Sequence, residues 1–170
     1  LVSSIFDLAR DASTSPFLAY VNGDILLLPE IVQATRQISI ELFNSPFLLI
    51  GQRWDLDVAT MLDFSAGWEA RLKDLVIRKG KLHAPAGSDY FVFPRSAFTE
   101  MPDFAIGRAG WDNWMIYHAR HHGFPVIDGT PSPMVIHQTH DYSHLPGGIA
   151  HYNLGESQHN MQIGGGLKHM

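Results

Sequence analysis

The chain has 170 residues, of which 45% are hydrophobic and 17% are charged, a composition typical of one globular domain with a buried core. Its formal net charge of −5 argues against a broad nucleic-acid-binding surface. The lack of cysteine excludes disulfide bonds and thiolate metal sites, and no apolar run reaches the roughly 20 residues of a transmembrane helix.

Strand-like and helix-like segments alternate along most of the chain. In chain order they are a helix at 1–13, a strand at 17–21, a turn at 22–24, a helix from Pro29 onwards, a strand at 46–53, helical stretches at 56–62 and 68–77, a loop at 80–89, a strand at 90–94, a helix at 111–122 and strands at 124–128 and 134–138. This alternation predicts an α/β layer structure with a mixed, mostly parallel sheet.

The two ends of the chain have different patterns. Apolar residues at positions 1, 2, 5, 6, 8 and 9 predict a helix already under way at Leu1, so we expect the chain to be a fragment. These residues do not resemble a secretory signal, which indicates a cytoplasmic protein. Residues 151–170 are rich in glycine and polar side chains and predict a flexible tail, leaving one domain over residues 1–150.

The tripeptide Asn22-Gly23-Asp24 follows the apolar run of the first strand. At the carboxyl end of a strand, Asp24 is a suitable oxygen ligand for Mg²⁺ or Mn²⁺ bound to phosphates. The same three residues are also common in tight turns that bind nothing. On the pattern alone, the turn is the simpler interpretation.

Asp112 lies between Trp111 and Trp114 at the expected start of the helix at 111–122. A carboxylate that two tryptophan rings partly shield from water can accept a proton from a hydroxyl group, as a general base does. An acidic residue at this position also interacts favourably with the helix dipole, by roughly 0.3–1 kcal/mol, without any catalytic role. The two interpretations are compatible.

The segment HQTHDYSH at 137–144 contains three histidines after an expected strand. His137, His140 and His144 are candidates to ligate a metal or to bind a diphosphate, although the segment lacks an HExxH signature and can also be a polar loop whose histidines contact water. The tryptophans are candidates for stacking on sugar rings, but most tryptophans in proteins belong to the core. The loop at 86–95 has a glycine that would allow close approach of a ligand, without matching a known phosphate-binding motif.

Taken in order, these segments resemble glycosyltransferases of the GT-A type, the nucleotide-diphospho-sugar transferase superfamily. The sequence YVNGD resembles the family's DxD metal motif, with Asn22 in its first position and Asp24 in its last. GSDYF at 87–91 resembles the acceptor loop, and GWDNW resembles the segment that supplies the base of inverting enzymes. HQTHDYSH offers the histidine that completes the metal site in many members.

The resemblance covers residues 1 to 145 and implies a three-layer α/β/α fold, with this chain forming the C-terminal portion of the catalytic domain. It implies a metal-dependent, inverting transfer of a sugar from a nucleotide-diphospho-sugar donor to an acceptor hydroxyl. The implied metal, Mn²⁺ or Mg²⁺, is bound by Asp24, His137 and His140, and Asp112 is the base. The implied substrate contacts are Asn22, Gly87, Ser88, Asp89, Trp111 and Trp114. Asn22 departs from the usual acid, and the family's N-terminal nucleotide-binding half is not part of this sequence.

Two other classes of function remain open from the sequence. A metal-dependent hydrolase would use the same acids and histidines around a metal-bound water to cleave a phosphoester or a nucleotide sugar. A non-catalytic carbohydrate-binding or interaction domain would use the tryptophans and would tolerate loss of Asp24 and Asp112. The order of the acidic motifs favours an enzyme, and the lack of a hydrolase motif favours the transferase.

Overall fold

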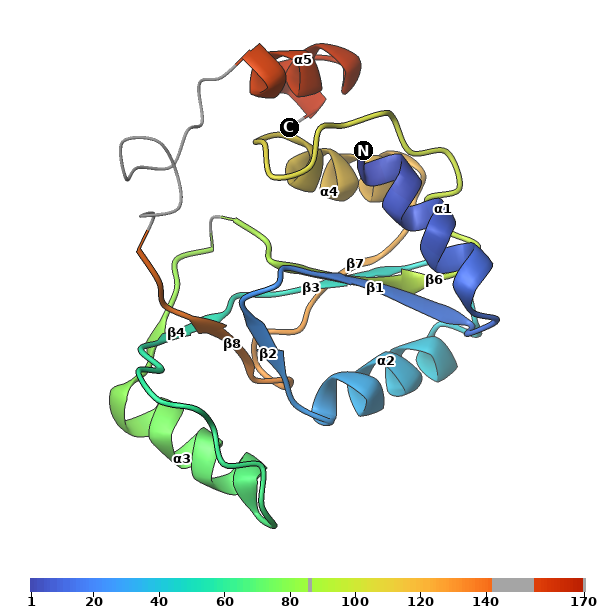
Figure 1. Ribbon diagram of the computed structural model, residues 1–170. Helices are drawn as coiled ribbons and strands as arrows, with labels where there is room; N and C mark the ends of the chain where they lie inside the picture. Colours follow the sequence, from blue (N-terminus) through green and yellow to red (C-terminus); the bar gives the residue numbers. More distant parts are fainter. Residues whose placement is uncertain (86, 142–154, 170) are drawn as a thin grey trace.

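The computed structural model describes residues 1–85, 87–141 and 155–169 and contains two four-stranded sheets (Figure 1). Sheet A consists, in spatial order, of β1 (Phe17–Val21), β6 (Tyr90–Pro94), β3 (Leu48–Ile50) and β7 (Val126–Asp128). Sheet B consists of β2 (Ile25–Leu27), β8 (Val135–Gln138), β4 (Trp54–Leu56) and β5 (Lys81–Leu82). The helices are α1 (Val2–Ala12), α2 (Glu30–Glu41), α3 (Trp68–Lys79), α4 (Trp111–His121), α5 (Gly155–Ile163) and the short 3₁₀ helix η2 (Leu167–His169).

Helices cover both faces of sheet A, which gives a three-layer arrangement (Figure 1). On one face, α1 and α4 contribute Phe6, Trp111 and Met115 to a core shared with Phe91 and Phe93 of β6. On the other face, α2 contributes Ile31 to a second core, which includes Leu49 of β3 and Tyr90 and Val92 of β6. All five residues of β6 are buried, as expected for a strand covered on both faces. The predicted α/β class is therefore confirmed.

The strand pairing differs from the mostly parallel sheet that the sequence predicts. Among the described strands, only β3–β7 and β4–β8 pair in parallel. The pairs β1–β6, β3–β6, β2–β8 and β4–β5 are antiparallel. A continuous apolar run such as Phe17–Val21 predicts a strand buried on both faces, but it does not show the direction of the neighbouring strands, and in β1 only Leu18 is buried.

The chain passes between the two sheets several times, and these crossings position the candidate site. It leaves sheet A for sheet B at residues 22–24, between β1 and β2, and again at residues 51–53, between β3 and β4. It returns through residues 83–89, between β5 and β6, and crosses once more between β7 and β8. Polar residues at these crossings therefore meet at the junction of the sheets, although they are far apart in the sequence.

Sheet B has one apolar face and one polar face at this junction. Leu56 of β4 and Ile136 of β8 are buried against α3, in a core that includes Leu72 and Val76. Successive side chains of a strand point to opposite faces, so the residues next to Leu56 and Ile136 point away from α3. One of these neighbours is His137, whose side chain is 13% exposed.

Two segments differ from their predicted structure. Residues 56–62 are not helical: Leu56 ends β4, where its carbonyl accepts a hydrogen bond from the Thr139 amide, and the next helix begins at Trp68. Residues 155–163 form α5, which the glycine-rich composition does not predict. The buried Asn160 attaches this helix to the loop before α4 through hydrogen bonds with Ala105 and Ala109. None of the described helices is long and apolar enough to span a membrane.

Candidate functional site

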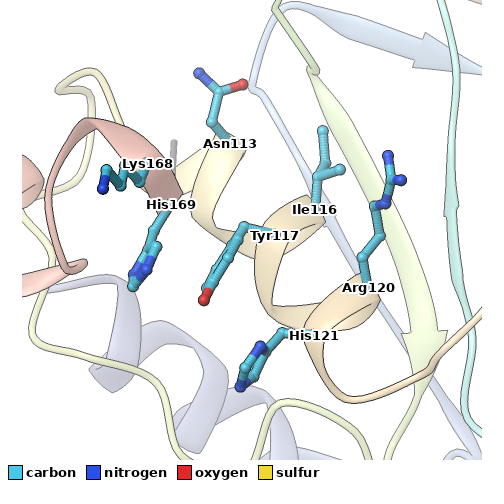
Figure 2. A pocket seen from close by; sticks show the side chains of 7 residues that line it. All are labelled: Asn113, Ile116, Tyr117, Arg120, His121, Lys168 and His169. Carbon is cyan, nitrogen blue, oxygen red and sulfur yellow. The ribbon is translucent and has the colours of Figure 1, made fainter.

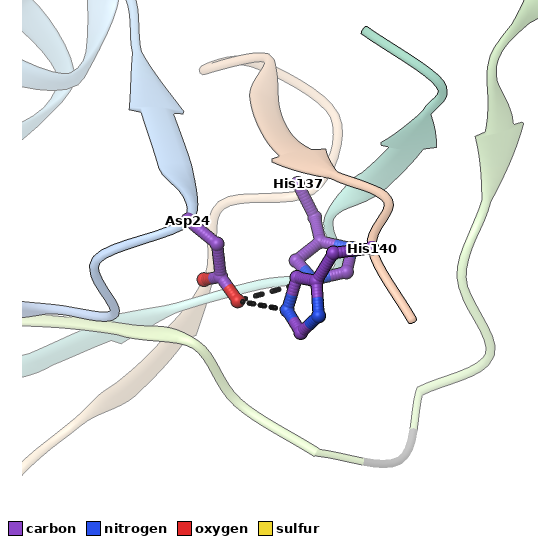
Figure 3. A group of neighbouring side chains, drawn as sticks. All are labelled: Asp24, His137 and His140. Carbon is purple, nitrogen blue, oxygen red and sulfur yellow. Dashed lines mark hydrogen bonds and ion pairs between the residues drawn. The ribbon is translucent and has the colours of Figure 1, made fainter. Parts of the chain in front are cut away.

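Asp24, His137 and His140 form a compact group at the junction of the two sheets (Figure 3). Asp24 immediately precedes β2, His137 lies on β8, and His140 follows the end of that strand. The antiparallel pairing of β2 with β8 places Ile25 opposite His137, so the adjacent Asp24 reaches the end of β8. Asp24 Oδ2 lies 3.3 Å from His137 Nε2 and 3.0 Å from His140 Nε2.

The donor atoms of this group fit a divalent cation. Two ligands at right angles around a cation, each at about 2.1 Å, are about 3 Å apart, which matches the separations from Asp24 Oδ2 to the two histidine nitrogens. Asp24 Oδ1 is buried and has no hydrogen-bond partner among the described residues, so this oxygen is also available to a ligand. One carboxylate with two imidazoles suits Mn²⁺ or Zn²⁺ better than Mg²⁺, which prefers oxygen ligands.

The electrostatics of the group favour an ionised carboxylate. Burial alone would raise the pKa of Asp24, but the hydrogen bond from His140 and the charge of His137 outweigh this effect and lower the pKa. The pKa of His140 is raised, because the Asp141 carbonyl and Asp24 accept hydrogen bonds from its ring. A metal ion would occupy the position of the proton that His140 shares with Asp24.

Asp55 is part of this site, although the sequence patterns do not point to it. Asp55 and His137 are paired in the parallel register of β4 with β8, and Asp55 Oδ1 lies 3.0 Å from His137 Nδ1. Its second oxygen lies 2.8 Å from Nδ1 of His83, which follows β5. Arg53 Nε also donates to Asp55 Oδ1, at 3.0 Å. The two oxygens of Asp55 therefore have three nitrogen partners.

A second set of contacts connects this network to the loop at 87–89. Arg53 forms a close ion pair with Asp89, whose other oxygen accepts a hydrogen bond of 2.8 Å from the Asn22 amide. The backbone amide of Asn22 also donates to the Asp89 carbonyl, at 3.0 Å. The resemblance implies that Asn22 and Asp89 are substrate contacts. In the structure, their side chains form a hydrogen bond with each other, and Asp89 also forms an ion pair with Arg53. Their observed role is to connect the two crossings at 22–24 and 83–89.

The loop at 87–89 borders a pocket of about 280 Å³. Gly87 and Ser88 contribute to its wall, and Gly87 has a φ of 86°, which favours glycine. Ile116 of α4 and Val126 of β7 form an apolar side, while Gln52 and Asp128 supply polar groups; Ile50, Gly51 and Pro85 complete the lining. A pocket with an apolar wall and a few polar groups is typical of sites for small ligands.

Asp112 lies in the first turn of α4, as the sequence predicts, and accepts a hydrogen bond of 3.3 Å from the Gly110 amide. Asp112 and Ile116 are four residues apart on this helix and therefore share one side of it. Ile116 borders the 280 Å³ pocket and also two further hollows along α4, whereas Asp112 is not among the residues that line any of the three. No described contact joins Asp112 directly to Asp24 or to the two histidines.

Tyr20 lies on β1, four residues before Asp24, and its ring contacts Trp111 at the start of α4. The pKa of Tyr20 is raised, first by burial and then by the charges of Asp24, Asp89 and Asp112.

Trp111 and Trp114 are core residues rather than exposed platforms for a sugar. They are 6% and 7% exposed, respectively. The Trp111 ring packs edge-on against Tyr20, at 4.7 Å between ring centroids, and Trp114 packs against Phe104 at 5.3 Å. The burial of these two rings argues against stacking on a sugar, because they fill the core between α4 and sheet A.

A separate hollow of about 460 Å³ lies between α4 and η2 (Figure 2). Its lining residues are Asn113, Ile116, Tyr117, Arg120, His121, Lys168 and His169. Figure 2 shows the side chains of Arg120 and Lys168 on opposite sides of the hollow, so their charges do not converge on one point. The hollow contains no acidic side chain, and the candidate chemistry lies instead at the junction of the sheets.

The candidate site thus consists of a possible cation-binding group, a network that supports it and a neighbouring pocket. The sequence patterns identify Asp24, His137 and His140 through their places at the ends of expected strands. The contributions of Arg53, Asp55 and His83 become visible only through strand pairing. Comparisons with protein-family models, curated proteins and solved structures found no match for this chain.

Proposed function

We propose that this chain is part of a metal-dependent glycosyltransferase that uses a nucleotide-diphospho-sugar donor. The observation that carries the proposal is the convergence of Asp24, His137 and His140 at a sheet junction, which the Asn22–Asp89 hydrogen bond connects to the loop bordering the 280 Å³ pocket. A divalent cation bound by these three residues would supply positive charge to a leaving diphosphate. Of the two cations that the resemblance implies, Mn²⁺ matches a site with two imidazoles better than Mg²⁺, which prefers oxygen ligands.

In this proposal, Asp112 accepts the proton of the acceptor hydroxyl. The resemblance supplies this role, and Asp112 is held in the first turn of α4, next to Trp111, which packs against Tyr20 of β1. The sugar is expected beside Gly87 and Ser88, where the backbone and a hydroxyl group are available. Asn22 and Asp89 hold this loop against the crossing at residues 22–24 and do not contact the sugar.

The two-histidine, one-carboxylate donor set also supports a second candidate, a metal-dependent hydrolase. Three protein ligands leave coordination positions open, where a bound water can become the nucleophile. The two proposals differ in their need for an acceptor. The hydrolase would release sugar or phosphate from its substrate at the same rate with and without an acceptor, whereas the transferase would depend on the acceptor.

The proposal is tested by isothermal titration calorimetry of the purified chain with UDP and GDP, with and without Mn²⁺. We expect Mn²⁺-dependent binding of one of these nucleotides, and its loss in Asp24→Ala. Asp57→Ala is the matched control, because Asp57 is exposed and lies outside the described network. Binding that is independent of Mn²⁺, or that survives in Asp24→Ala, would contradict the proposed site.

A second arm of the titration tests the nucleotide-binding half that the resemblance would place before residue 1. The same measurement on a chain extended at its N-terminus should then show tighter nucleotide binding, with the same dependence on Asp24. If a folded, extended chain binds Mn²⁺ but neither nucleotide, the transferase proposal is wrong, whereas the proposed metal site is still supported. The hydrolase would then be examined with simple phosphoesters.

A further inference from the structure

We propose that Asp55 is a positioning residue that fixes the ring orientation and the tautomer of His137 for metal binding. The inference rests on the proposed metal centre and extends it to a residue that no sequence motif identifies. Asp55 does not reach the donor oxygens of Asp24; it contacts the opposite nitrogen of the His137 ring. Its effect is therefore exerted through His137.

The geometry of the strands makes this contact a fixed one. Asp55 and His137 are direct partners in the parallel pairing of β4 with β8, with side chains on the same face of sheet B. The flanking pairs, Trp54 with Ile136 and Leu56 with Gln138, hold the register on both sides. A shift by one residue would turn the buried Leu56 and Ile136 away from their core, so the hydrophobic pattern enforces the register.

His137 lies between two carboxylates, Asp55 at Nδ1 and Asp24 at Nε2, so Asp55 can influence which ring nitrogen carries the proton. Asp55 Oδ1 is 3.0 Å from Nδ1, and Asp24 Oδ2 is 3.3 Å from Nε2. A neutral imidazole carries one proton, which can be on either nitrogen. When Nδ1 donates that proton to Asp55, the lone pair of Nε2 points towards Asp24 and is available to a metal ion. Without Asp55, Asp24 is the remaining described carboxylate acceptor, and the proton moves to Nε2, where it blocks coordination.

Asp55 is itself held in one orientation. Arg53 Nε donates to Oδ1 and the His83 ring contacts Oδ2, so each oxygen has a nitrogen partner other than His137. Asp55 is therefore an oriented acceptor for a proton on His137 Nδ1. Carboxylates that orient metal-binding histidines in this way typically contribute 10–100-fold to metal affinity.

The test combines Mn²⁺ affinity with the tautomer of His137. The affinity is measured by calorimetry on the wild-type chain, Asp55→Asn and Asp55→Ala, with Asp57→Asn as the control on the same segment. We expect the Kd for Mn²⁺ to rise about 10–100-fold in both Asp55 variants and to stay unchanged in the control. Circular dichroism and thermal melting of the metal-free proteins establish whether each variant is folded.

The tautomer is read from long-range ¹H–¹⁵N spectra of metal-free protein at pH 8, with the His137 signals assigned by their loss in His137→Gln. The wild type should carry its proton on Nδ1, and the folded Asp55 variants should shift it to Nε2. A wild-type proton on Nε2 would overturn the inference, as would unchanged affinity and tautomer in a folded variant. A wild type that shows the Nδ1 tautomer but binds no Mn²⁺ would refute the proposed metal centre instead, so the two failures are distinguishable.

Discussion

The Tyr20 ring packs edge-on against the Trp111 ring, with 4.7 Å between their centroids. Tyr20 is on β1, four residues before Asp24, and Trp111 is the first residue of α4, next to Asp112. This contact fixes the strand that leads to the proposed metal ligand relative to the helix that carries the proposed base. A rigid support of this kind is required if two groups on different elements are to act on one substrate.

The first prediction concerns Asp112. Replacement of Asp112 by asparagine should reduce sugar transfer by about 10²–10⁴-fold, the usual contribution of a general base, because the amide cannot accept the proton. Nucleotide binding should remain within about twofold, since Asp112 has no described contact with the metal-ligand group. Transfer is measured with a donor that the calorimetric titration has identified. Asp103→Asn, on the exposed loop before α4, is the control, and unchanged transfer in Asp112→Asn would remove Asp112 from the mechanism.

The second prediction concerns Gly51, where the chain leaves β3 for sheet B. A methyl group added at Gly51 would lie 2.8 Å from the Thr130 backbone nitrogen and would also clash with the Tyr90 hydroxyl. We expect Gly51→Ala to lower the free energy of unfolding by about 1–3 kcal/mol, as overpacking usually does. Gly155→Ala should have little effect, because no atom lies within 4 Å of the added carbon.

A double-mutant cycle tests the cause of this effect. The Tyr90 hydroxyl is buried and has no hydrogen-bond partner among the described residues, so Tyr90→Phe should cost little or stabilise the fold. Combined with Gly51→Ala, it should restore part of the lost stability by removing one of the clashing atoms. Strict additivity in urea denaturation would show that Gly51 and Tyr90 do not interact as the structure indicates.

The third prediction concerns the pH dependence of stability. Burial, together with the charges of His122 and His121, lowers the pKa of His118 to about 4. The unfolded chain takes up this proton near pH 6.5, whereas the folded protein resists protonation until about pH 4. Stability should therefore fall as the pH decreases through this window, by an amount on the order of 1–2 kcal/mol once solvent screening of the half-buried ring is considered.

Urea denaturation at pH 7 and pH 5 measures this effect. The stability lost between the two pH values should be smaller in His118→Gln, whose side chain does not titrate, than in the wild type. His159→Gln is the control, because His159 is exposed on α5 and its replacement should leave the loss unchanged. An equal loss in His118→Gln and the wild type would contradict the assignment of this pH dependence to His118.

The fourth prediction concerns the core between α1 and sheet A. The Phe93 ring is 1% exposed and stacks on Phe6 of α1, with 5.3 Å between centroids. Phe93→Ala should lower the free energy of unfolding by about 3–5 kcal/mol, because it loses buried apolar area and leaves a cavity. Phe43, which is 90% exposed, offers the matched control, and Phe43→Ala should change stability by no more than about 0.5 kcal/mol. Similar losses in both variants would show that Phe93 is not in the core.

The sequence predicts the elements that have an apolar pattern and misses those that lack one. The helices at 68–79 and 111–121 and the strand at 90–94 appear as expected, because each shows a periodic or continuous apolar pattern. The strands β4 and β5 were not predicted, because Trp54–Leu56 and Lys81–Leu82 contain charged residues and lack the apolar run that marks the similarly short β3 and β7. Their identity depends on pairing with distant parts of the chain.

The same distinction explains which site residues could be found from the sequence. Asp24 and His137 lie at the ends of apolar runs, and their meeting follows from the pairing of β2 with β8. Asp55 belongs to the unpredicted β4, and its role depends on the register with His137, which sequence spacing does not contain. The two tryptophans beside Asp112 illustrate the opposite error, since a stacking role and a core role have the same sequence pattern and only burial separates them.

The most direct test of the central proposal is a crystal of this chain soaked in Mn²⁺, examined for anomalous scattering from the metal. We predict one strong anomalous peak about 2.0–2.3 Å from Asp24 Oδ2, His137 Nε2 and His140 Nε2, and its disappearance in Asp24→Ala. A peak elsewhere on the protein, or no peak at Mn²⁺ concentrations in the millimolar range, would contradict a metal centre formed by these three residues.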